Sequence, residues 1–234
     1  MNLEMFDNWF LQTVAGQYVA GWEKSFFKRF YFCGEMQIAV QAGMCGWLEP
    51  LGTWLCNSRD FYMDAGVWAW ADESVDVLLM PHTLECSGVP YVTLAEAYRV
   101  MKPEGKVVLT GFNPYSLWGC SNWFDGVLLP DKKFCLPLQT LKANAKALGF
   151  EVVFGQFMVY VPPFDNEKLL RLCHFMEAAG NRWWPHKAAV YGLVLQKSVG
   201  GVHILPEYGQ VLQNAEMVLG MAKIKSRFLN ADCC

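Results

Sequence analysis

Continuous apolar runs and one amphipathic segment alternate in the middle of the chain. Residues 75–80 and 106–110 are nearly uninterrupted runs of Val, Leu and Met, as expected for strands that are buried on both faces. Between them, residues 93–101 place Leu, Ala, Tyr and Met on one helical face, while Glu and Arg fall elsewhere. Strand, helix and strand in this order predict a right-handed βαβ unit with parallel strands.

The remaining apolar runs extend this pattern to a larger α/β sheet. Five further short runs that border turn residues predict strands, at residues 36–42, 53–56, 61–64, 150–154 and 189–196. Helical spacing of apolar residues predicts helices, at 138–148, 166–179 and, more weakly, 211–225. Gly149 is well placed as the C-cap of the first of these helices, and residues 102–105 are expected to form a turn.

The N-terminal segment, residues 3–31, carries aromatic side chains at helical spacing, which predicts one or two helices. Gly16 and Gly21 favour a break in the middle of this segment. Its end mixes bases with aromatic residues, as a helix at a membrane surface would. A helix that packs on the core and keeps its bases in water explains the same pattern, so both interpretations stay open.

The spacing of the first strands indicates a reduced sheet. Only 33 positions separate Gly43 from Asp76, whereas two βαβ passes need about 60 residues. At least one crossover helix is therefore expected to be missing or short. We expect the N-terminal helices to cover the face of the sheet that this leaves bare.

Composition narrows the class of protein. The 234 residues are 53% hydrophobic and 18% charged, which is typical of a chain with a packed core. The formal net charge is −3 without a block of bases, so nucleic acid is not expected as a main ligand. No repeat or linker divides the chain, which predicts one domain over residues 1–234. Within it we expect N-terminal helices at 1–33, a Rossmann-like core at 36–197 and a tail at 207–234.

Cysteine usage and hydropathy suggest a location. The nine cysteines are scattered without a Cys-x-x-Cys pair, which fits neither a disulfide framework nor a metal site. A reducing compartment, and hence a cytoplasmic protein, is therefore expected. No run reaches the roughly 18 apolar residues that span a bilayer, and no signal-peptide pattern is present. Stable membrane insertion is not expected.

Several motifs resemble one enzyme superfamily. The segment Glu73-Ser74-Val75-Asp76-Val77-Leu78 and the helix-to-turn segment Leu94-x-Glu96-x-x-Arg99-Val100-Met101-Lys102-Pro103-Glu104-Gly105 are similar to class I S-adenosylmethionine (SAM)-dependent methyltransferases. Three further segments, at 80–85 (MPHTLE), 111–119 (GFNPYSLWG) and 180–185 (GNRWWP), resemble a proteobacterial branch of the methyltransferase type 11 group. The resemblance covers most of residues 5–206. It implies a Rossmann-like three-layer α/β sandwich with extra N-terminal helices. Its seven-stranded sheet would be mostly parallel, with an antiparallel last strand.

The resemblance implies SAM as cofactor and suggests where it binds. In the superfamily, Gly-x-Gly-x-Gly after the first strand lets the backbone approach the ligand, and Gly43 and Gly46 remain of it here. No acid ends the second strand, so Asn57 or Asp60 would replace the acid that binds the ribose. Asp64 stands like the acid that contacts adenine, although a turn or cap role is the alternative. Pro81 and Phe112 complete the expected cofactor residues.

Ligands in open α/β sheets bind beyond the carboxyl ends of the strands, which points to the residues that follow the buried runs. His82 is the expected general base, with a structural hydrogen bond as the alternative. Asn113 and Tyr115 are expected to orient the acceptor, although Asn113 with its following proline also suits a turn. The expected substrate contacts are Glu85, Trp118 and Arg182; Glu85 could instead pair with the histidine, and Arg182 could pack on the last strand.

Two functions remain open from the sequence. One is a SAM-dependent methyltransferase that acts on a small-molecule acceptor. The other is a catalytically inactive protein of the same fold that serves as a binding module, which the reduced glycine turn and the missing ribose acid favour. A lipid-associated protein that uses the aromatic N-terminal helix is a third, weaker reading. Enrichment in Trp and Tyr would also suit a homo-oligomer interface.

Overall fold

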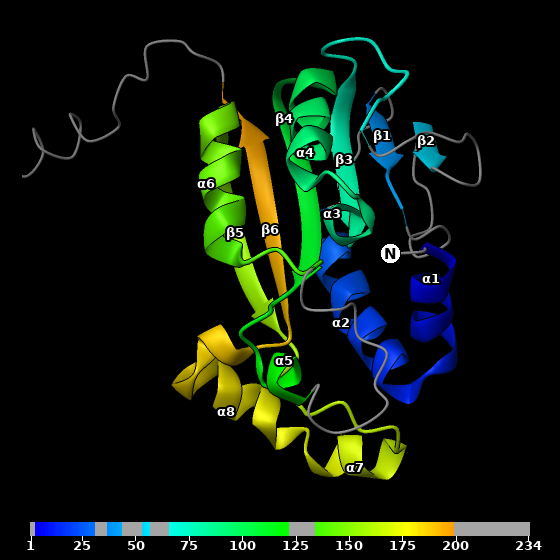
Figure 1. Ribbon diagram of the computed structural model, residues 1–234, viewed down its shortest axis with the longest axis vertical. Helices are drawn as coiled ribbons and strands as arrows, with labels where there is room; N and C mark the ends of the chain where they lie inside the picture. The colour runs from blue at the N-terminus through cyan, green and yellow to red at the C-terminus, as the bar shows by residue number, and fades with distance from the viewer. Residues whose placement is uncertain (1–2, 31–36, 44–52, 57–65, 122–133, 199–234) are drawn as a thin grey trace, which may run out of the picture. The chain divides into compact units, whose positions relative to one another are not determined.

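The computed structural model describes residues 3–30, 37–43, 53–56, 66–121 and 134–198 (Figure 1). These residues belong to one compact unit, which comprises residues 1–199. The strand expected at 61–64 and the helix expected at 211–225 lie outside the described residues, as does the expected tail. Among the described residues, no helix is both long and apolar enough to cross a membrane.

Six strands of the described residues form one sheet in the order β2-β1-β3-β4-β6-β5 (Figure 1). They are β1 (Ile38–Gln41), β2 (Thr53–Cys56), β3 (Val75–Pro81), β4 (Met101–Phe112), β5 (Phe150–Met158) and β6 (Val190–Lys197). Strands β2, β1, β3 and β4 pair in parallel, and β6 runs antiparallel to both β4 and β5. The predicted α/β fold, with a mostly parallel sheet and an antiparallel last strand, is thereby confirmed.

Helices cover both faces of the sheet, because successive residues of the buried strands point to opposite sides. On β3, Val77 and Leu79 pack in the cluster that contains α1 (Leu3–Gln12) and α2 (Val14–Phe30). Leu78 and Met80 pack in the other cluster, with α4 (Pro90–Val100) and α6 (Leu138–Leu148). The shorter elements are α3 (Thr83–Cys86), α5 (Leu117–Ser121), α7 (Glu167–Leu172), α8 (Phe175–Trp183) and the 3-10 helix η1 (Pro185–Lys187).

The N-terminal helices pack on the sheet through their aromatic residues. Phe6, Phe10, Phe26 and Phe27 are all buried, while the bases Lys28 and Arg29 at the end of α2 are exposed. The aromatic N-terminal segment therefore has its apolar side in the core, and the lipid-associated reading of this helix is wrong.

The break between α1 and α2 lies at Thr13, not at the glycines. The Thr13 hydroxyl donates to the Trp9 carbonyl at 2.8 Å and accepts the N–H of Gly16 at 2.9 Å, so it caps the start of α2. Gly16 is needed for packing, because a Cβ there would lie 2.3 Å from the Trp9 carbonyl oxygen. Gly21 is exposed, and a Cβ there would have no neighbour within 4 Å.

Two predicted elements differ in detail. The turn expected at 102–105 is a bulge inside β4, since Val75 pairs with Met101 and Val77 already pairs with Lys106. The single helix expected at 166–179 is two helices, and the Asn166 side chain caps the first by accepting the N–H of Lys168 at 2.9 Å. The helix at 138–148 and its cap at Gly149, which has φ +100°, are confirmed.

Candidate functional site

The topological switch point of the sheet lies between β1 and β3. From β1 the chain passes to β2 on one side and then returns to β3 on the other, and ligands of α/β sheets bind at such a switch point. Gly43 stands just beyond β1, with φ +88°, a conformation that residues other than glycine rarely adopt. The expected cofactor residues Gly46, Asn57 and Asp64 lie outside the described residues.

Hydrogen bonds fix the turn at Gly43 against the end of β3. The N–H of Ala42 donates to the Leu79 carbonyl at 2.8 Å, and the Thr83 hydroxyl donates to the Ala42 carbonyl. The Gln41 amide donates to the Gly43 carbonyl at 2.8 Å. A Cβ on Gly43 would lie 3.4 Å from the Thr83 hydroxyl and 3.6 Å from the Pro81 carbonyl oxygen. Gly43 and Pro81 are thus brought together, as the sequence predicts.

A buried charged cluster occupies the carboxyl end of β3. His82 follows the strand with φ 50°, and its Nδ1 lies 2.5 Å from Glu85 Oε2 on α3. Its Nε2 lies 2.7 Å from Glu23 Oε1 on α2. All three side chains are at most 1% exposed. Glu85 also accepts the N–H of Phe112 through its other oxygen, so it joins the ends of β3 and β4.

The two carboxylates hold His82 in its charged form. Desolvation alone would lower the pKa of His82, but the charges of Glu23 and Glu85 and their hydrogen bonds outweigh it and raise this pKa to about 10. Burial raises the pKa of Glu23, although the charge of His82 and its hydrogen bond act against this rise. Both ring nitrogens of His82 face buried carboxylates and the side chain is 0% exposed, so this arrangement corrects the expected role of His82 as general base.

Aromatic side chains close over this cluster. The His82 ring stacks on Phe112 at 4.6 Å between centroids and contacts Phe6 and Phe10 of α1 at 5.0 and 5.2 Å. Trp118 is 2% exposed, and its indole N–H donates to the Val161 carbonyl at 2.7 Å. The expected substrate contacts of Glu85 and Trp118, and the cofactor contact of Phe112, are therefore not available at this surface, because all three side chains are buried in protein.

Asn113 joins the loop after β4 to the start of β6. Its side-chain amide donates to the carbonyls of His186 and Ala188, at 2.9 and 3.0 Å, and its oxygen accepts the N–H of Tyr115 at 3.0 Å. The side chain is 7% exposed and fully engaged, which corrects the expectation that it orients an acceptor. Tyr115 is 61% exposed, and its expected contact with the acceptor stays a prediction.

Arg182 lies at the exposed end of α8. Its guanidinium carbon is 5.7 Å from the centroid of the Trp183 ring, and that indole is exposed as well. This cation–π contact holds Arg182 on the surface of the helix and does not bury it against β6. Its expected contact with substrate stays a prediction.

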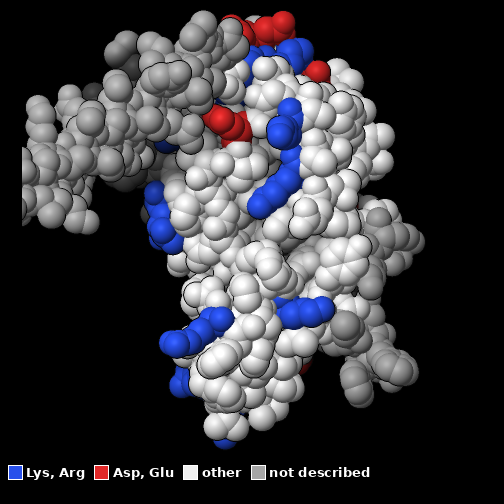
Figure 2. Space-filling view, turned by 90° about the vertical axis from the view of Figure 1, so that its left-hand side faces the viewer, with Lys and Arg blue, Asp and Glu red and all other residues white. Residues whose placement is uncertain are grey.

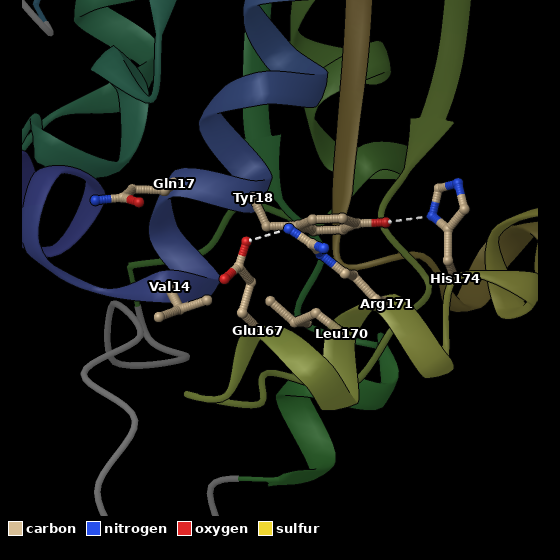
Figure 3. A pocket seen from close by; sticks show the side chains of 7 residues that line it. All are labelled: Val14, Gln17, Tyr18, Glu167, Leu170, Arg171 and His174. Atoms are coloured by element: carbon tan, nitrogen blue, oxygen red, sulfur yellow. Dashed lines mark hydrogen bonds and ion pairs between the residues drawn. The ribbon is translucent and has the colours of Figure 1, made fainter.

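A cavity of about 650 Å³ lies between α2 and α7 (Figure 3). Its lining residues are Val14, Gln17, Tyr18, Glu167, Leu170, Arg171 and His174. The Tyr18 hydroxyl lies 3.2 Å from His174 Nδ1 and donates to Glu177 at 3.0 Å. Burial, together with the charge of Glu177, raises the pKa of Tyr18 to about 12.

Glu23 and this cavity are the features that sequence reasoning missed. Glu23 lies within a stretch of mixed bases and aromatic residues, where the local pattern gives a charged residue no reason to be buried. It is 59 positions from His82, and Tyr18 is 159 positions from Glu177. Contacts over such separations leave no signal in local periodicity.

Comparisons with known proteins agree with the fold. Residues 59–109 match the family model described as a methyltransferase domain. The chain is 48% identical over 50 residues to the uncharacterized protein YafS of Escherichia coli (strain K12), a match that spans 21% of either chain.

Solved structures extend the likeness over most of the chain. A SAM-dependent methyltransferase from Archaeoglobus fulgidus is 16% identical, with a TM-score of 0.50, over 76% of this chain and 94% of that one. A SAM-dependent methyltransferase from Thermotoga maritima is also 16% identical, with a TM-score of 0.50, over 75% of this chain and 88% of that one. At this identity the structures show the fold alone. The family-model match over residues 59–109 agrees with the resemblance to class I SAM-dependent methyltransferases, whereas the proteobacterial branch stays a prediction.

Proposed function

We propose, from the premise of a class I SAM-dependent methyltransferase fold, that this chain binds SAM at the switch point beside Gly43 and transfers its methyl group to a small-molecule acceptor. The observation that carries the proposal is the left-handed glycine turn at the end of β1, between β2 and β3. A turn without a side chain lets the backbone approach a ligand closely, and the crevice at a switch point is where α/β sheets bind nucleotides.

The described residues fit such a ligand at this point. Gly43 has no side chain to block a ligand, although it is buried, and the Thr83 hydroxyl and the Pro81 carbonyl lie next to it as polar neighbours. When bound, SAM supplies an activated methyl group, so the protein mainly binds and orients the two reactants. Gly46, Asn57 and Asp64 complete the proposed cofactor residues.

The state of His82 restricts the acceptor. A protonated, buried imidazolium does not take a proton from the acceptor, and the buried Glu85 carboxylate is already engaged by His82 and by the N–H of Phe112. We therefore propose an acceptor whose nucleophile is already free of its proton near neutral pH, such as a carboxylate or a weakly basic amine. Tyr115, which is exposed, is the candidate for contact with that acceptor.

A second candidate function is binding of SAM without turnover. It is favoured by the burial of His82, Glu85, Asn113 and Trp118, four of the residues that the sequence proposes for catalysis or substrate. In that case the chain is an interaction module that responds to the cofactor.

Incubation with SAM that carries an isotopically labelled methyl group separates the two candidates. The chain would be offered pools of small carboxylates and amines, and label in a small-molecule product supports methyl transfer. Saturable binding of SAM with no transfer to any pool favours the second candidate. Failure of a folded protein to bind SAM or its demethylated product at millimolar concentration contradicts both.

A further inference from the structure

Helices α7 and α8 expose large apolar side chains. Leu172, Phe175 and Trp183 are 72%, 69% and 71% exposed, and Leu169 and Trp184 are exposed to a lesser degree. Single exposed apolar residues are common on protein surfaces, but these five fall together within residues 169–184, which favours an interaction site. These five residues are called the α7–α8 surface below, together with the bases Lys168, Arg171, Arg182 and Lys187.

The bases of this surface outnumber its acids. All four bases are exposed, and the exposed acids of residues 165–187 are Asp165 and Glu167. The chain as a whole has a formal net charge of −3, so this surface is more positive than the rest of the chain. Figure 2 shows Lys and Arg side chains over the lower part of this face, where acidic side chains are almost absent.

The inner side of α8 is held by buried contacts, and on α7 the side chain of Leu170 is buried. The buried Glu177 carboxylate accepts the backbone N–H groups of Tyr160 and Val161 at 3.1 and 3.3 Å. Gly180 lies directly on the Tyr160 ring, since a Cβ there would be 2.3 Å from it. The outward side chains therefore belong to anchored helices and not to a loose end.

The helices also lie at the end of the sheet where the switch point is found. Helix α7 comes after β5 and α8 comes before the antiparallel β6, so both are near the carboxyl ends of the parallel strands (Figure 1). The α7–α8 surface is thus at the same end of the strands as Gly43.

We propose that the α7–α8 surface docks on an anionic lipid bilayer. Trp, Phe and Leu side chains enter the boundary between headgroups and acyl chains, while Lys and Arg next to them bind lipid phosphates. A second copy of this chain is a poorer occupant, because a twofold contact would bring the same bases face to face. This docking goes beyond the proposed methyl transfer and does not depend on it.

Flotation with lipid vesicles, in the absence of SAM, tests the docking. The full chain would be mixed with vesicles of phosphatidylcholine and with vesicles of equal parts phosphatidylcholine and phosphatidylglycerol. We expect binding to the anionic vesicles that weakens as salt is added, and little binding to the neutral ones.

Two pairs of variants assign the binding to this surface. Lys168→Gln with Lys187→Gln removes two bases, and should weaken binding roughly 30-fold at about 1 kcal/mol per base. The matched control, Lys142→Gln with Lys146→Gln, removes two exposed bases of α6 and should leave binding unchanged.

The apolar pair follows the same design. Leu172→Ser with Phe175→Ser should weaken binding by about tenfold or more. Its control changes the similarly exposed Leu11 and Val67 to Ser and should have no effect.

Equal flotation with neutral and anionic vesicles, no flotation at all, or equal effects of the variants and their controls would overturn the proposal. A wild-type dimer in gel filtration that the apolar α7–α8 variant dissociates, without vesicle binding, would assign the surface to self-association instead. Because the assay contains no SAM, its outcome is separate from that of the cofactor-binding test.

Discussion

The buried Glu23–His82–Glu85 cluster makes stability fall as the pH rises above neutrality. The pKa of His82 is raised from 6.5 to about 10 in the folded chain, so its stabilising effect is fully present below pH 6.5 and is lost as the pH rises toward the folded value. At about 1.36 kcal/mol per pH unit, the free energy of unfolding should fall by about 2 kcal/mol between pH 6.5 and about 8.

The two other shifted groups near His82, Glu23 and Cys86, act in the same sense. The titratable neighbours are Glu23 from α2 and Glu85 from α3, whereas α1 and β4 contribute aromatic rings. The raised pKa of Glu23 also lowers stability as the pH rises, from 4.5 through its folded value. The thiol of Cys86, whose pKa burial raises to about 12, adds to the fall only once unfolded thiols ionise, so an upper limit of about pH 8 avoids it.

Urea unfolding followed by tryptophan fluorescence measures this fall. His82→Asn suits the left-handed backbone at this position and should remove the fall, but it leaves two buried carboxylates without a partner, at about 3–5 kcal/mol. Glu23→Gln is the milder variant, and should keep the fold and give a shallower fall. Equal stability of the wild type at both pH values, or an unchanged fall in both variants, would refute the charged cluster.

Further predictions concern packing and the loop after β4, all measured by the same urea titration. Gly21→Ala should raise the free energy of unfolding by about 0.5–1 kcal/mol, because alanine is the better residue in an exposed helix; a decrease would contradict the assigned exposure. Gly16→Ala should lower it by about 1–3 kcal/mol, because its Cβ would overlap the Trp9 carbonyl, and unchanged stability would contradict that close packing. Asn113→Ala should lower it by about 2–3 kcal/mol, because buried carbonyls lose their donor, whereas Tyr115→Ala should change it by less than about 0.5 kcal/mol. Equal effects of these last two variants would contradict the structural role of Asn113.

Much of the fold follows from local patterns. The strands at 75–80 and 106–110 are buried on both faces, so their apolar runs were enough to predict a parallel βαβ unit. The cap at Gly149 was predictable because a glycine directly after an amphipathic helix is specific for that position. The bulge in β4 was not predictable, because it depends on the pairing register between β3 and β4.

The site was less predictable than the fold. The turn at Gly43 was predictable because this glycine directly follows the apolar run that predicts the first strand. The pairing of His82 with Glu85 was open as an alternative, but its second partner, Glu23, was not found, because it comes from a helix 59 positions away. The same holds for Trp118, whose partner is a backbone carbonyl 43 positions away. Residue type and spacing alone do not separate a buried ion pair from a catalytic base.

Calorimetric titration of the wild type and of Gly43→Ala with SAM tests the proposed cofactor site most directly. We predict saturable micromolar binding to the wild type and binding weakened by about tenfold in Gly43→Ala, since an alanine at φ +88° strains the turn by about 1–2 kcal/mol. Gly88→Ala is the matched control, because Gly88 is exposed and a Cβ there would have no neighbour within 4 Å. Absence of binding by the folded wild type, or equal affinity in Gly43→Ala and Gly88→Ala, would contradict a SAM site beside Gly43.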